Sequence, residues 1–262
     1  MRDVTDDLNE FRLSRNKVDD ILGSLHGSES LFGKTLIMKK FEQELNELRH
    51  RVVEMGDLTE TMVRQAIEAI SHTDDKRLFD SVFHDEERLD QMQLDIDKEA
   101  IRLLTIYSPV ATNLRFIMSV SRITAELERI GDHATNMCES VQLMTSKTKA
   151  PLLPEVLTMA GIVCGMVSDA LNAFLQNDIK KAQSTIASDD MVDALDDQII
   201  KELLSDEVVR EVLKGPKDIA GALAQLLIVR SLERIADQST NISEEVVYMV
   251  KGDDIRHGAS ND

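Results

Sequence analysis

Leu127-Glu128-Arg129-Ile130-Gly131-Asp132-His133-Ala134-Thr135-Asn136 is the stretch that determines how the chain is organised, because it occurs twice. The second copy, at residues 232–241, reads Leu-Glu-Arg-Ile-Ala-Asp-Gln-Ser-Thr-Asn. Seven of the ten positions are identical at a constant offset of 105 residues. Repetition at a fixed offset is the sequence signature of a duplicated structural unit. We therefore expect the chain to be built from two similar halves.

Each copy contains two carboxylates four residues apart, Glu128 with Asp132 and Glu233 with Asp237, followed by an Asn one turn later. Residues at this spacing lie on one face of a helix. Like charges so placed destabilise an isolated helix by roughly 0.2–0.5 kcal/mol, so their recurrence in both copies calls for a reason. An apolar stripe runs beside the first pair and consists of Leu127, Ile130, Ala134, Met137 and Val141. The carboxylates are thus expected next to a buried seam.

The composition predicts a helical protein with an aliphatic core. The chain has 42% apolar residues, no Trp and only four Pro among 262 residues. Its net charge of −18 argues against nucleic-acid binding, which requires clustered Lys and Arg, and suits cations or basic protein partners. Cys138 and Cys164 are isolated and are expected to be reduced, as in cytosolic proteins. We expect no signal peptide and no membrane span, since no apolar run approaches about 18 residues.

Apolar residues at steps of three and four predict three long helices in the first half. They are expected over about 38–72, 75–107 and 110–146. Ser108-Pro109 ends the second helix, because the residue before Pro is pushed out of the α region. Long helices joined by short turns favour an antiparallel three-helix bundle.

The second half repeats this plan, so the predicted fold is all-α with two tandem antiparallel three-helix bundles. Its second and third helices are expected over about 178–204 and 218–251. The predicted divisions of the chain are a loose N-terminal extension (1–37), a first repeat (38–146), a linker (147–154), a second repeat (155–251) and a disordered tail (252–262).

The second helices of the two halves also correspond, at an offset of 103 residues. Each half therefore has acidic pairs on two helices, and packing those helices together gathers four carboxylates. The first acidic cluster consists of Glu86, Asp90, Glu128 and Asp132. The second acidic cluster consists of Asp189, Asp193, Glu233 and Asp237.

Four neighbouring carboxylates repel one another unless some are protonated or a multivalent cation lies between them. Oxygen ligands suit hard cations, so Mg²⁺, Ca²⁺, Mn²⁺ or iron is the expected type of metal. The alternative is a solvated acidic helix face, since such pairs are frequent in a chain with 48 Asp and Glu. The duplication adds weight to the cation site.

No catalytic motif is evident in the sequence. A di-iron carboxylate enzyme requires Glu-x-x-His on two helices, whereas Gly131 and Ala236 occupy the third position after Glu128 and Glu233. A small residue there would let a neighbouring helix or a ligand approach closely. Nothing in the sequence argues for an active site. A metal-dependent bundle enzyme or metal store is the main alternative, and a plain helical scaffold is a third.

The two copies of Leu-Glu-Arg-Ile-Gly/Ala-Asp resemble the paired motifs of the PhoU family of bacterial phosphate-signalling regulators. Further likeness is carried by Asp85-Glu-Glu-Arg-Leu-Asp90, by Phe41-x-x-x-Leu45-x-x-Leu48 and by Asn241-Ile-x-Glu244. The likeness covers about residues 38–252. It implies two similar three-helix bundles, in agreement with the periodicity.

The resemblance also implies a function. It implies a cytoplasmic, dimeric, non-enzymatic protein that lies at the inner face of the membrane through its partners. Those partners would be the ATPase of the phosphate ABC transporter and a sensor histidine kinase. The implied role is negative regulation of phosphate uptake and of the phosphate-starvation genes. Multinuclear iron or zinc clusters are implied on the acidic motifs, with the members of the first and second acidic clusters as ligands.

Two features depart from the family pattern. The 37 residues before Met38 have no counterpart in it. Asp189 occupies the position that is Glu86 in the first half, and its shorter side chain is expected to alter metal geometry or occupancy there.

Overall fold

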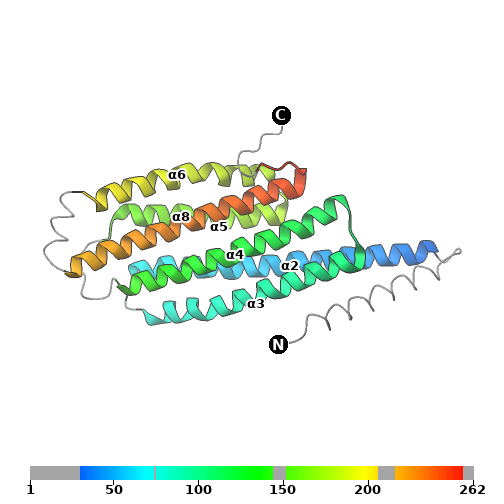
Figure 1. The fold of residues 1–262 in the computed structure, drawn as a ribbon, viewed down its shortest axis with the longest axis horizontal. Helices are drawn as coiled ribbons and strands as arrows, with labels where there is room; N and C mark the ends of the chain where they lie inside the picture. The colour runs from blue at the N-terminus through cyan, green and yellow to red at the C-terminus, as the bar shows by residue number, and fades with distance from the viewer. Residues whose placement is uncertain (1–29, 74, 144–151, 206–215, 256–262) are drawn as a thin grey trace.

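Long helices make up the described part of the chain in the computed structural model, which describes residues 30–73, 75–143, 152–205 and 216–255 (Figure 1). The first half contains α2 (Ser30–Ser71), α3 (Lys76–Tyr107) and α4 (Ala111–Leu143). The second half contains α5 (Pro154–Gln176), α6 (Ile179–Leu203) and α8 (Pro216–Lys251). The predicted all-α fold with two three-helix bundles is confirmed.

The second helix of each half is capped at its N-terminus by an Asp. Asp75 accepts a hydrogen bond from the backbone N–H of Arg77 at 3.1 Å, and Asp178 accepts one from that of Lys180 at 2.9 Å. These carboxylates satisfy the free N–H groups at the starts of α3 and α6. Asn177 has a left-handed backbone (φ 52°) and ends α5.

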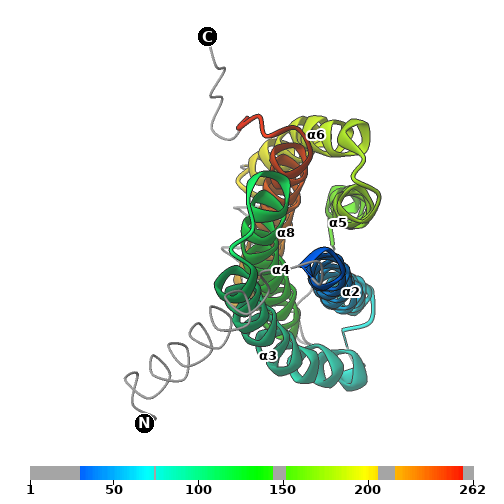
Figure 2. The same ribbon diagram turned by 90° about the vertical axis from the view of Figure 1, so that its right-hand side faces the viewer.

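The six helices form a curved layer with two helices on one side of it. Figure 2 shows α3, α4, α8 and α6 side by side in that order, with α2 and α5 on the same face of this layer. Each bundle therefore contributes two helices to the layer and one to the covering pair. The contact between α4 and α8 is the most extensive between any two of the described helices, and the buried apolar residues of both halves form one core.

Two boundaries in the structure differ from the predicted divisions of the chain. Helix α2 begins at Ser30, so residues 30–37 are helical and do not belong to a loose extension. Extending a formed helix needs no new nucleation, and the single Gly33 costs only about 1 kcal/mol, which the rest of a 42-residue helix tolerates. At the other end, Ile255 packs against the core, so the tail does not begin at 252. The predictions for 1–29, 147–151 and 256–262 lie outside the described residues.

Helix α5 also departs from the expectation that no segment is apolar enough to cross a membrane. Among the described helices it alone passes that test of length and composition. Its apolar residues, however, pack into the core: Val156, Met159, Val163 and Phe174 are buried. Helix α5 contacts α6, α8 and α2. The structure therefore uses α5 as a core helix of the second bundle.

Candidate functional site: two acidic clusters

Both acidic clusters lie on the four-helix layer, each between the two layer helices of one bundle. Glu86 and Asp90 are on α3 and face the pair on α4, while Asp189 and Asp193 on α6 face the pair on α8. The predicted apolar stripe of α4 is completely buried, so the adjacent carboxylates lie at the boundary between core and solvent. The expected assembly of each cluster from two helices is thus present.

The carboxylates of the first acidic cluster repel one another across the helix contact. Burial raises the pKa of Glu86, and the negative charges of Asp90 and Asp132 raise it further. The pKa of Glu128 is raised by burial and then by Asp132 and Asp90, and that of Asp132 by burial and Asp90. Because neighbouring negative charges disfavour ionisation, these shifts are the electrostatic consequence of bringing the two pairs together.

The largest pKa shift among the carboxylates of the two clusters is that of Asp189, in the second acidic cluster. Burial raises the pKa of Asp189 to about 6, and Asp193 and Asp237 contribute to the shift. Burial also raises the pKa of Glu233 and that of Asp237, while Arg230 and Arg234 act in the opposite direction on both. This cluster is therefore partly neutralised by its own half of the chain.

Arginine pairing distinguishes the two clusters. In the second, Arg234 lies 3.5 Å from carboxylate oxygens of both Glu233 and Asp237, and Arg230 lies 3.6 Å from Glu233. In the first, Arg129 occupies the position of Arg234 but pairs with Glu126 at 2.9 Å.

Arg129 and Arg234 form different ion pairs because the residues beside them differ in the sequence. The position of Glu126 is occupied by Ser231 in the second copy, and that of Arg230 by Ala125 in the first. Arg234 therefore has no acidic neighbour equivalent to Glu126, and its side chain pairs with carboxylates of the second acidic cluster. The chemistry of the motif is modified by its neighbours, which comparison of the motifs alone does not reveal.

Asn241 bonds outside the second acidic cluster. Asn241 is exposed and donates a hydrogen bond from Nδ2 to Glu126 Oε2 of the other half at 3.3 Å. The carboxamide predicted one turn after Asp237 thus forms a link between α8 and α4. It is a contact between the two halves.

The small residue of the motif serves helix packing. A Cβ at position 131 would collide with Leu89 on α3, which is almost fully buried and has little room to move. Ala236, at the same position of the second copy, is completely buried. Close approach of a neighbouring helix, rather than a ligand, explains the requirement at Gly131.

The carboxylates suit a cation in charge and donor type. All donors are oxygens, and a multivalent cation would relieve the repulsion among the carboxylates of the first cluster. Oε2 of Glu233 is buried and accepts no hydrogen bond from a described residue, but nitrogens of Arg230 and Arg234 lie 3.6 Å and 3.5 Å from it. As placed, no three His, Cys, Asp or Glu side chains of the described ranges converge closely enough to hold a metal ion. Binding therefore requires the side chains to turn toward a common point.

The thiols and the motif histidine do not contribute to the clusters. Cys138 and Cys164 are free, and burial raises the pKa of Cys138 to about 12. His133 is half-buried, and burial followed by the charge of Arg234 lowers its pKa. The two free thiols are consistent with the predicted reduced cysteines.

Titration of Asp189 gives a first prediction, for the metal-free protein. Its pKa of about 6 in the folded state lies above its ordinary value of 3.8, so its contribution to stability is present below pH 4 and is lost as the pH rises through 6. The free energy of unfolding of Asp189→Asn, relative to that of the wild type, should therefore rise by about 1 kcal/mol from pH 4.5 to pH 7, after allowance for solvent screening. Urea denaturation at both pH values measures this.

The matched control for this prediction is Asp57→Asn, at an exposed position of α2. The change with pH in the effect of Asp189→Asn should exceed the change measured for this control. If Asp189→Asn behaves in the same way as the control, the side chain is not held in a repulsive environment.

Two helical bundles that each present acidic pairs on paired helices define a class of duplicated helical-bundle proteins. The model of the PhoU domain matches residues 52–141 and 156–246, one match in each half. The chain belongs to the PhoU family.

Curated relatives match most of the chain. It is 36% identical over 222 residues to the Phosphate-specific transport system accessory protein PhoU homolog of Pseudomonas putida, and the match covers 84% of each protein. It is 33% identical over 221 residues to the Phosphate-specific transport system accessory protein PhoU of Escherichia coli (strain K12), covering 84% of this chain and 89% of the relative.

Solved structures share the fold. The crystal structure of PhoU from Pseudomonas aeruginosa superposes with a TM-score of 0.75 at 33% identity and covers 81% of this chain and 100% of its own. The phosphate transport system regulatory protein PhoU from Streptococcus pneumoniae gives a TM-score of 0.73 at 27% identity, covering 82% and 98%.

Proposed function

We propose that this chain is a regulatory accessory protein of a phosphate transport system, which restrains phosphate uptake and phosphate-starvation signalling without catalysing a reaction. The observation that carries the proposal is the match of both halves to the PhoU domain, together with relatives named as phosphate-transport accessory proteins along nearly their full length. The duplicated acidic clusters fit such a role, because they offer a charged surface to a protein partner.

The proposed partners are the transporter's ATPase and a sensor histidine kinase, which the protein would connect as an adaptor. A net charge of −18 favours basic surfaces on both partners and would speed association with them. This role places the protein in the cytoplasm, at the membrane only through its partners. We also propose that it acts as a homodimer.

The regulatory role is tested by deletion of the gene. A deletion strain grown in high phosphate should express alkaline phosphatase, because repression of the phosphate-starvation genes would be lost, and a plasmid copy should restore repression. The readout is phosphatase activity per cell. A deletion strain with unchanged repression in high phosphate would contradict the role.

We further propose that the acidic clusters bind a multivalent cation, with iron or zinc as the first candidates and Mg²⁺, Ca²⁺ or Mn²⁺ as others. The first acidic cluster is the stronger site, because Arg129 pairs directly with Glu126 and acts on Glu128 only through its charge, whereas Arg230 and Arg234 pair with carboxylates of the second. A bound cation would fix α3 against α4 and thereby the shape of the surface presented to partners.

A further inference from the structure

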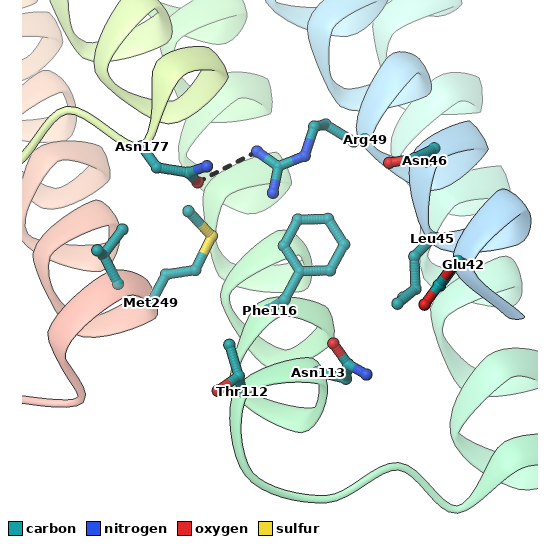
Figure 3. Close-up of a pocket in the computed structure, with 10 residues that line it drawn as sticks. Glu42, Leu45, Asn46, Arg49, Thr112, Asn113, Phe116, Asn177 and Met249 are labelled. Atoms are coloured by element: carbon teal, nitrogen blue, oxygen red, sulfur yellow. Dashed lines mark hydrogen bonds between the residues drawn. The ribbon is translucent and has the colours of Figure 1, made fainter. Parts of the chain in front are cut away.

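A cavity of about 420 Å³ lies where the first turn of α4 and the end of α8 meet α2 and the end of α5 (Figure 3). This volume falls within the roughly 300–1,000 Å³ typical of small-molecule sites. Phe116 in its lining and Glu128 of the first acidic cluster are twelve residues apart on α4, about 18 Å along the helix axis. The cavity is therefore separate from the acidic clusters.

Arg49 is the cation of this cavity and has no carboxylate partner among the described residues. Its guanidinium lies over two aromatic rings, 4.6 Å from the centroid of Phe116 and 5.2 Å from that of Phe174. Nη1 donates hydrogen bonds to the carbonyl oxygen of Phe174 at 3.1 Å and to Asn177 Oδ1 at 3.4 Å.

The remaining N–H groups of this side chain, on Nε and Nη2, have no acceptor within the described ranges. Arg49 is half-buried, and burial lowers its pKa. The two rings offset part of the cost of its desolvation, but they do not occupy its free donors. Arg49 is therefore a cation with unused hydrogen-bonding capacity at the wall of a cavity.

The rest of the lining is polar on one side and apolar on another. Asn46, Thr112 and Asn113 supply side-chain amides and a hydroxyl, and Figure 3 shows Asn113 and Phe116 projecting from α4 toward the same space as the Arg49 guanidinium. Met249 closes the apolar side with Phe116. The one carboxylate of the lining, Glu42, is exposed and forms no ion pair with Arg49.

We propose that this cavity binds a small organic molecule through one oxyanion group, a phosphate or a carboxylate, with Arg49 as its anchor. The planar guanidinium presents several donors to one anion and forms strong charge-assisted hydrogen bonds. Phe116 and Met249 would contact the apolar part of the ligand, and the amides of Asn46 and Asn113 its uncharged polar groups. This inference goes beyond the regulatory role proposed above and does not depend on it.

Isothermal titration calorimetry on the full-length protein tests the site with four probes: phenyl phosphate, benzoate, orthophosphate and benzyl alcohol. At least one of the two aromatic anions should bind at millimolar concentration or below, roughly tenfold or more tightly than the uncharged benzyl alcohol. The tighter of the two anions identifies the source as phosphate or carboxylate. Weaker binding of orthophosphate than of phenyl phosphate would support contact of Phe116 and Met249 with the apolar part of the ligand. Equal binding of the two would overturn that contact.

Two variants locate the binding at Arg49. Arg49→Gln should weaken the aromatic anion roughly tenfold or more. Asn113→Asp adds a negative charge at an exposed position of the lining, so it should weaken binding without affecting the fold. The matched control, Arg64→Gln, alters an exposed arginine of α2 that pairs with Glu60 at 2.9 Å, and should bind as the wild type does.

The proposal is overturned if neither aromatic anion binds at millimolar concentration. It is equally overturned if Asn113→Asp and a folded Arg49→Gln both bind as tightly as the wild type. Should Arg49→Gln fail to fold, Asn113→Asp alone decides between these outcomes.

Discussion

Replacing Glu128 by Gln together with Asp132 by Asn is expected to abolish cation binding in the first half of the chain. The first acidic cluster would lose two of its four carboxylates, and the remaining pair on α3 cannot surround an ion from one helix. Protein purified without chelators should then contain less metal by elemental analysis. Stabilisation by added cation, about 2.7 kcal/mol at one hundred times the dissociation constant for the wild type, should be lost from this site.

The double variant has a second expected effect, of opposite sign. In the metal-free protein it removes charges that repel Glu86 and Asp90, so its free energy of unfolding at pH 7 should equal or exceed that of the wild type. A loss of metal caused by unfolding would not show this pattern. Unchanged metal content in a folded double variant would contradict the proposed site.

Two matched changes complete this test. Glu47→Gln with Glu54→Gln removes two exposed carboxylates from α2 and should leave metal content unchanged, because these residues are not in either cluster. Glu233→Gln with Asp237→Asn should have a smaller effect than the change in the first half, because Arg230 and Arg234 already compensate those carboxylates.

Replacing Phe174 by Ala is expected to lower the free energy of unfolding by about 3–5 kcal/mol. Phe174 is one of the largest fully buried side chains of the described residues. Its ring stacks on Phe116 with a centroid separation of 6.4 Å and lies 5.2 Å from the Arg49 guanidinium. The substitution thus opens a void where α5 of the second half meets α2 and α4 of the first. Urea denaturation measures the change.

The size of this loss can be calibrated within the same protein. Phe174→Leu retains most of the volume and should cost about 1 kcal/mol. Phe41→Ala removes a partly buried ring that contacts Tyr107, the last residue of α3, and should cost about 1–2 kcal/mol. If Phe174→Ala costs no more than Phe41→Ala, the contact between α5 and the first half is less important than its burial indicates.

Sequence periodicity predicted the helices because burial follows it closely. Leu127, Ile130 and Ala134 lie at helical spacing and are all completely buried. The facing of acidic pairs across α3 and α4 was also predictable, since both pairs border the same seam. The position of α4 against α8 was not, because an internal offset shows that two helices are alike and does not show that they touch.

Other features depend on tertiary contacts that leave no pattern in the sequence. Arg129 and Arg234 are identical within the repeat, yet they pair differently because Glu126 is present beside only one of them. Arg49 reads as an ordinary surface arginine of a helix, and only its contacts with Phe116 and Phe174 show that it lines a cavity. The start of α2 was missed because Ser30 and Gly33 are residue types typical of helix breaks.

The contact between α4 and α8 joins equivalent helices of the repeat, as subunits meet in a symmetric dimer where the same patch is used twice. The chain thus resembles a dimer whose two subunits have been fused into one polypeptide. Fusion releases the two copies from the requirement of identity. Ser231 and Arg230 can differ from Glu126 and Ala125 without disturbing the partner half, so one acidic cluster can be neutralised while the other remains open. A true dimer of identical subunits could not divide these roles between its two sites.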